Sequence, residues 1–158
     1  MRILGLDPGT LALGYGLIED DPPRFVASGA LTVSARTPIG ARLLKLYQGV
    51  MEVIGRFRPQ EVAVEEPFVS KNPRSALALG RAQGIAVLAA AAWGLPLYYY
   101  SPAQVKQQAA GYGNSPKAQV QEMVRLQLGL ETAPQPADAA DALAVALCHY
   151  YQTRQELR

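Results

Sequence analysis

Four acidic side chains stand where chain segments end or begin, and their chemistry suits a metal site. Asp7 closes the apolar run RILGLD, and Glu65 closes the run EVAVE. Asp138 and Asp141 stand three residues apart in PADAADALAVA, among alanine, leucine and valine. Ligand sets of carboxylate oxygens favour hard divalent cations such as Mg²⁺ or Mn²⁺. Two such cations about 3.5–4 Å apart can clamp the attacking and leaving oxygens of a phosphodiester.

Each acid also has a purely structural explanation. Asp7 precedes a Pro-Gly pair, where aspartates commonly close turns. Either Glu65 or Glu66 could be the solvated end of a strand. Asp138 near the start of a helix complements the helix dipole. In the helix that begins at residue 136, one face would carry Asp138, Asp141, Ala142, Val145 and His149. That face could simply be the side of the helix that solvent covers. The coincidence of acids in three separate segments favours a converging site.

The elements that must position these acids follow from apolar periodicity. Strands are expected at 2–7, 14–19, 24–33, 58–66 and 95–100. Helices are expected at 37–57, 72–94, 101–113 and 114–130, and from 136 onward. Thr37 and Asn72 are the predicted N-caps of the first two helices. This order predicts an α/β fold with a mixed five-stranded sheet, an antiparallel meander plus parallel strands, flanked by helices. Sites in such sheets form beyond the carboxyl ends of strands, where Asp7 and Glu65 stand.

Length and composition indicate one globular domain over residues 1–158, with 152–158 as candidates for disorder. The chain is 49% hydrophobic and 18% charged. A single cysteine, Cys148, excludes an intrachain disulfide, and a single histidine, His149, excludes a Cys/His zinc cluster. The opening MRILGLD is strand-like, and Gly94-Leu95-Pro96 interrupts the most apolar stretch before the roughly 20 residues that a membrane span needs. A cytoplasmic protein without membrane attachment is expected.

The net charge of +2 is unevenly distributed along the chain. Residues 68–125 hold six basic residues and one acidic residue, whereas residues 1–67 and 126–158 each carry a small excess of acids. Such a distribution is typical of a protein that binds phosphate backbones with its basic part and metal with its acids. The scarcity of acids, more than the number of bases, marks the middle segment.

Six segments together resemble the RuvC family of Holliday-junction resolvases. They are LGLDPGTLALGYGLIE, VAVEEPFVSKN, SALALGRAQG, QVKQ, KAQVQEMV and PADAADALAVA, in family order over nearly the whole chain. The resemblance implies a ribonuclease-H-like fold and a homodimer that nicks two strands of a four-way DNA junction symmetrically in recombination and repair. It implies hydrolysis with two Mg²⁺ ions per site, for which Mn²⁺ substitutes, leaving 5′-phosphate and 3′-hydroxyl ends. It also implies work alongside the RuvA–RuvB branch-migration complex.

The resemblance assigns roles to individual residues. The catalytic, metal-binding acids would be Asp7, Glu65, Asp138 and Asp141. Glu65 rather than Glu66 matches the family's glutamate, because Phe68 follows three residues later. Some relatives carry a histidine at the position of Asp138, so Asp138 is expected to be the most replaceable.

Residues expected to contact DNA are Phe68, Lys71, Arg74, Lys106 and Lys117. Phe68 would stack on an unpaired base at the crossover, with an ordinary core phenylalanine as the alternative. Lys106 and Lys117 match lysines that the family uses near the cut phosphate. The alternative for both is a solvated surface lysine.

A stripe of small residues in the second predicted helix is the expected dimer interface. It comprises Ala76, Gly80, Gly84, Val87 and Ala91. Small side chains let another helix approach closely, so the stripe could instead pack on the protein's own sheet. The resemblance favours the dimer.

Three other functions compete with the resolvase. LDPGTLALGYG also resembles the first phosphate loop of sugar kinases and actin-like ATPases, but those folds need a second domain and a second loop, for which 158 residues leave no room. A related ribonuclease-H-like family that processes ribosomal RNA precursors shares the Asp-Pro-Gly opening. The segments KNPRSALALG and PADAADALAVA favour the resolvase over it. The four acids argue against a non-catalytic nucleic-acid-binding module.

Overall fold

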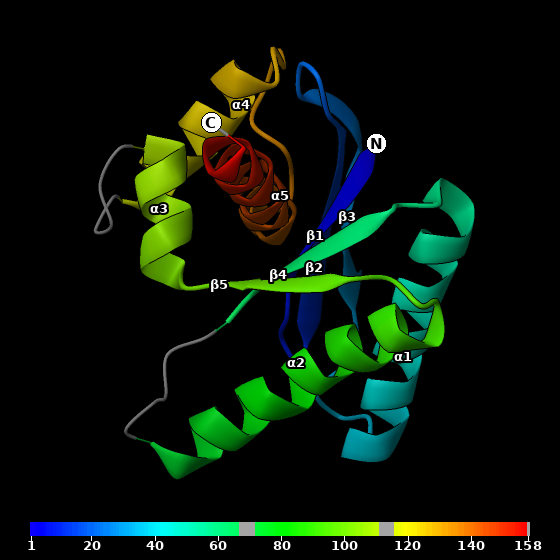
Figure 1. Cartoon of the computed structure of the whole chain (residues 1–158). Helices are drawn as coiled ribbons and strands as arrows, with labels where there is room; N and C mark the ends of the chain where they lie inside the picture. Colours follow the sequence, from blue (N-terminus) through cyan, green and yellow to red (C-terminus); the bar gives the residue numbers. More distant parts are fainter. Residues whose placement is uncertain (67–71, 111–115, 158) are drawn as a thin grey trace.

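The computed structural model describes residues 1–66, 72–110 and 116–157, in which a five-stranded sheet stands between two groups of helices (Figure 1). The strands, in the spatial order β3-β2-β1-β4-β5, are β1 (Arg2–Asp7), β2 (Ala12–Glu19), β3 (Arg24–Thr32), β4 (Glu61–Glu65) and β5 (Leu97–Tyr100). β1 pairs antiparallel with β2 and β2 with β3, whereas β4 runs parallel to β1 and β5 parallel to β4. The predicted meander with parallel additions is therefore confirmed.

Helices cover both faces of the sheet, as Figure 1 shows. On one face lie α1 (Ile39–Phe57) and α2 (Pro73–Ala92), and on the other lie α3 (Pro102–Ala110), α4 (Lys117–Gln127) and α5 (Ala137–Glu156). Alternate residues of β1 supply the two cores: Leu4 and Leu6 pack with α1 and α2, and Ile3 packs with α5.

The start of α1 differs from the prediction by one residue. Pro38, not Thr37, is the N-cap, and no side chain caps the helix. The physical reason is that the carbonyl of Pro38 already accepts the first helical hydrogen bond, from Arg42 N–H at 3.0 Å, which leaves Thr37 outside the first turn. For α2, the prediction is confirmed: the side chain of Asn72 accepts a hydrogen bond from Arg74 N–H at 3.0 Å.

Only the second half of α2 packs on the sheet, and its first half extends beyond it (Figure 1). Its buried residues are Ala82, Ile85, Ala86, Ala89 and Ala90. Within the described residues, α2 is the one helix long and apolar enough to cross a membrane by length and composition, and only 28% of its most apolar window is buried. Much of its apolar surface therefore faces outward.

Helix α5 is buried from its second turn to Tyr150. On the face that carries the aspartates, Ala142, Val145 and His149 are fully buried. The alternative that this face is a solvated stripe is therefore wrong. The helix continues to Glu156, so residues 152–156, which were candidates for disorder, form its last turns.

Candidate metal centre

Three of the four acids meet at the carboxyl end of β1. Asp7 is the last residue of β1, and Asp138 and Asp141 lie in the first two turns of α5. One carboxylate oxygen from each of the three lies within 4.8 Å of the others, and all three residues are half-buried. Oxygen ligands this close to one another suit a hard divalent cation. The donor set therefore fits the metal predicted from the sequence.

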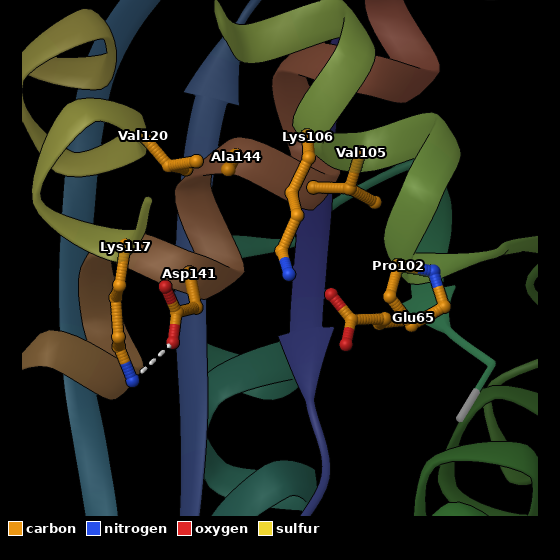
Figure 2. Close-up of a pocket in the computed structure, with 8 residues that line it drawn as sticks. All are labelled: Glu65, Pro102, Val105, Lys106, Lys117, Val120, Asp141 and Ala144. Atoms are coloured by element: carbon orange, nitrogen blue, oxygen red, sulfur yellow. Dashed lines mark ion pairs between the residues drawn. The ribbon is translucent and has the colours of Figure 1, made fainter. Parts of the chain in front are cut away.

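Glu65 faces this cluster from the neighbouring strand. It ends β4, which runs parallel to β1, so both strands bring their last residue to the same edge of the sheet. Glu65 lines a pocket of about 220 Å³ together with Asp141, Lys106 and Lys117 (Figure 2). Its sequence neighbour Glu66 is exposed, and its N–H donates to the carbonyl of Tyr100 at 2.7 Å.

Two lysines enter the same pocket from α3 and α4. Lys117 Nζ lies 3.0 Å from Asp141 Oδ2, and the amine of Lys106 points between Asp141 and Glu65 (Figure 2). The pocket therefore joins anionic groups, which suit a cation, to cationic groups, which suit a phosphate. Of the other predicted DNA contacts, Arg74 is exposed in the first turn of α2. Phe68 and Lys71 lie outside the described residues.

Burial and repulsion by neighbouring acids raise the pKa of Asp7 and of Glu65. The pKa of Asp7 rises to about 8, first because the carboxyl is buried and then because Glu65, Asp141 and Asp138 surround it. Burial and Asp141 also raise the pKa of Glu65, against the opposing charges of Lys106 and Lys117. A bound cation would relieve this repulsion, so the electrostatics fit a metal as well as the ligand set does.

The pKa of Asp7 leads to a prediction for the metal-free protein. Because folding raises this pKa, Asp7 favours the folded state most below about pH 4, and this contribution is lost as the pH rises through about 8. In EDTA, the Tm should fall over this window, with Asp7 contributing at most about 1.4 kcal/mol per pH unit. Saturating Mg²⁺ should reduce the fall, because the cation favours the carboxylate. The check is differential scanning calorimetry across the pH range; an equal slope in Asp7→Asn would contradict this account.

Glycines on β1 and β2 let α5 lie directly on the sheet. A Cβ on Gly14 would stand 2.0 Å from the carbonyl oxygen of Asp138, and a Cβ on Gly5 would stand 2.1 Å from that of Ala142. Gly14 pairs with Asp7 across β1 and β2. The start of α5 therefore contacts β2 at Gly14, directly opposite Asp7 on β1. The close contact at Gly14 thus sets the distance between Asp7 and Asp138.

Gly14→Ala should weaken metal binding by about tenfold or more, a loss typical when the support of a metal ligand is removed. The added methyl cannot coexist with the Asp138 carbonyl, so the start of α5 must move away from Asp7. Titration with Mn²⁺, followed by electron paramagnetic resonance, measures the effect. Gly40→Ala is the matched control, because a Cβ at Gly40 meets nothing within 4 Å. Equal Mn²⁺ affinity in both variants would refute the role of Gly14.

Two features of this region were not predicted from the sequence. One is the glycine contact under α5, for which the signal was glycine inside a strand, a mark of close backbone approach. The other is a hydrogen-bonded group of Glu61, Tyr100 and His149 behind the pocket. Its signal was the position of His149 on the aspartate face of α5.

Comparison with known proteins gives the chain a family. The family model described as crossover junction endodeoxyribonuclease RuvC matches residues 3–149. A relative of that name from Dehalococcoides mccartyi is 56% identical over 154 residues, covering 96% of this chain and 92% of the relative. Another, from Chloroflexus aggregans, is 54% identical over 153 residues, with 96% and 93% covered.

Solved structures agree with these sequence matches. Thermus thermophilus RuvC in complex with Holliday junction substrate superposes with a TM-score of 0.92 at 40% identity, covering 99% of this chain and 96% of that one. The yeast mitochondrial Holliday junction resolvase Ydc2, at a TM-score of 0.63 and 14% identity, shares the fold alone. The predicted ribonuclease-H-like fold is thereby confirmed. The chain belongs to the crossover junction endodeoxyribonuclease RuvC family.

Proposed function

We propose that this protein is a metal-dependent endonuclease that resolves four-way DNA junctions by symmetric paired nicks in recombination and repair. The observation that carries the proposal is the meeting of Asp7, Asp138 and Asp141 within 4.8 Å, beside a pocket lined by Glu65 and two lysines. Membership of the RuvC family and the close match to a relative bound to Holliday junction substrate support the junction as the substrate.

In this proposal the four carboxylates hold two Mg²⁺ ions, for which Mn²⁺ can substitute. When bound, such cations neutralise phosphate charge and make an attacking water more acidic. Water adds to phosphorus and the bond to the 3′ oxygen breaks, so the products carry a 5′-phosphate and a 3′-hydroxyl. The surroundings of Asp7 support this assignment: burial first, and then the charges of the other three acids, raise its pKa, and a bound cation would offset both effects.

The two lysines are proposed to hold the scissile phosphate. Lys117 pairs with Asp141, and its side chain is 60% exposed, so it can turn from the carboxylate to a phosphate oxygen. Asp141, whose side chain is 22% exposed, would then be left to a bound cation. Lys106 points between Asp141 and Glu65 in Figure 2, where its charge could pair with a phosphate held by cations that the acids bind. Arg74, Lys71 and Phe68 remain proposed DNA contacts.

A homodimer is proposed because two matched nicks need two sites related by symmetry, and one chain carries one site. The outward face of α2 supports this. Leu77 and Leu88 are 55% and 58% exposed, and the stripe residues Gly80, Gly84, Val87 and Ala91 are exposed too, whereas Ala76 is half-buried. An apolar pocket of about 430 Å³ lies between α1 and α2 beside this face. A second copy would cover these groups, whereas the protein's own sheet does not.

Incubation with Mg²⁺ and three substrates tests the function. A synthetic four-way junction should be cut by nicks in two opposed strands, while linear duplex of the same sequence stays intact. Cleavage of structured RNA in preference to the junction would favour the ribosomal RNA processing alternative. Junction binding without cleavage would leave only a binding module. We further propose that the protein acts in the cytoplasm beside the RuvA–RuvB complex; faster resolution when that complex is added would support this.

A further inference from the structure

The packing of α5 leaves one question open, namely what fixes its rotation about its own axis. Residues 142–150 are all buried, and most are alanine, leucine or valine. A helix that is apolar on every side can bury similar area at several rotation angles, because apolar packing specifies geometry less sharply than polar contacts do. The angle matters, since side-chain tips lie roughly 5–6 Å from a helix axis and a rotation of about 30° moves them by about 3 Å. Such a shift would break up a cluster whose oxygens lie within 4.8 Å.

His149 interrupts this apolar surface. In the described part of the chain it is the one fully buried polar side chain, with 0% exposure. Its Nε2 lies 2.6 Å from Glu61 Oε2, and its Nδ1 lies 2.7 Å from the hydroxyl oxygen of Tyr100. The ring also packs against Tyr98, with 4.4 Å between ring centroids. Both ring nitrogens are therefore used.

The chemistry of the carboxylate fixes the direction of one of the two bonds. The carboxylate of Glu61 can only accept, so His149 Nε2–H is the donor. In the neutral ring, Nδ1 then offers a lone pair, and the Tyr100 hydroxyl donates to it. Burial raises the pKa of Tyr100, which keeps that hydroxyl protonated. The bond to Glu61 therefore has one direction in either protonation state of the ring, and both partners restrain the ring in its plane.

The partners of His149 belong to the strand that carries Glu65 and to the strand that pairs with it. Glu61 is the first residue of β4, the strand that ends at Glu65. Tyr100 is the last residue of β5, where it pairs with Glu65, and its carbonyl accepts from Glu66 N–H. His149 therefore links α5, which carries Asp138 and Asp141, to the strand that carries Glu65 and to the strand beside it.

We propose that His149 is a positioning residue whose bonds to Glu61 and Tyr100 fix the rotation of α5 and so direct Asp138 and Asp141 toward Asp7 and Glu65. His149 follows Asp141 by eight residues, about 12 Å along the axis, on the same face of the helix. The contact is thus remote from the metal ligands and acts only through the rigid helix. This inference rests on the proposed function, because it assumes that the acids bind metal.

The double variant His149→Leu/Tyr100→Phe tests the inference without leaving a buried hydroxyl unpaired. Glu61, whose side chain is 20% exposed, can turn to water. Without DNA, the affinity for Mn²⁺ measured by calorimetry should fall about tenfold, as for loss of other outer contacts that orient metal ligands. Cys148→Ala is the matched control, because Cys148 is fully buried at the adjacent position of α5. It should keep wild-type affinity at a comparable Tm. His149→Gln, which can still donate to Glu61, should recover part of the loss.

The outcomes separate this inference from the proposed function. A wild type that binds no Mn²⁺ would refute the metal site itself. A wild type that binds Mn²⁺, with a double variant of equal affinity, would overturn only the role of His149. If the double variant does not fold, Glu61→Ala removes one bond at the accessible end of the contact. Weaker Mn²⁺ binding than in Cys148→Ala would then support the inference, and unchanged binding would overturn it.

Discussion

Asp7→Asn will abolish junction cleavage, by on the order of 10³-fold or more, as expected for removal of a central catalytic group, and it will leave junction binding largely intact. The amide keeps the size of the side chain but removes a negative charge from the centre of the acid cluster. The basic groups proposed to contact phosphate are untouched, so affinity for DNA should persist. Glu65→Gln and Asp141→Asn should act in the same way, because each removes one ligand charge.

Parallel cleavage and gel-shift assays with one labelled junction check this result. Near-wild-type cleavage by any of the three variants would show that its residue is not a required ligand. Asp138→His should retain more activity than the others, since histidine can also ligate a metal. A complete loss in Asp138→His would contradict the idea that this position is the most replaceable.

Gly84→Leu is expected to convert the proposed dimer to a monomer and to remove the proposed paired nicking. A Cβ at Gly84 meets nothing within 4 Å of its own chain, so the monomer tolerates the new side chain. The leucine would instead stand where a second helix must approach the exposed face of α2. Sedimentation should report a mass near 17.0 kDa for the variant and twice that for wild type.

The control for this prediction is Gly40→Leu, on an exposed position of α1 that also has open space around it. It should remain dimeric and cut both strands. A monomeric wild type, or a Gly84→Leu variant that is still dimeric, would rule out this face of α2 as the interface. If a variant stays dimeric but makes only single, uncoupled nicks, dimer formation and the coordination of the two active sites are separate properties.

The succession of strands and helices along the chain and the segment ends that bear acids could be predicted from the sequence because both are local. Asp7 and Glu65 close apolar runs, and parallel strands bring such ends to one edge. The observed N-cap of α1 differs from the predicted one by one residue. Thr37 and Pro38 both mark the start of a helix, and only backbone geometry shows which of them is the cap. The part played by Gly14 depends on how closely α5 approaches it at Asp138, 124 residues later in the chain, which no local pattern records.

The position of His149 shows the same limit. Its place on the aspartate face of α5 was visible in the sequence, but its partners lie 88 and 49 residues earlier in the chain. Only the parallel pairing of β4 and β5 brings Glu61 and Tyr100 to either side of the ring. Sequence therefore indicated which residues bear the chemistry, and tertiary packing determined which residues support them.

The most direct test of the central claim compares Glu65→Gln with Glu66→Gln in cleavage of a four-way junction with Mg²⁺. Both variants lose one negative charge at adjacent positions, but Glu65 lines the acid pocket while Glu66 is exposed. If the pocket cuts the junction, Glu66→Gln will cleave at nearly the wild-type rate, and Glu65→Gln will bind the junction without cutting it. Equal cleavage by the two variants, whether both active or both inactive, would contradict the assignment of the active site to this pocket.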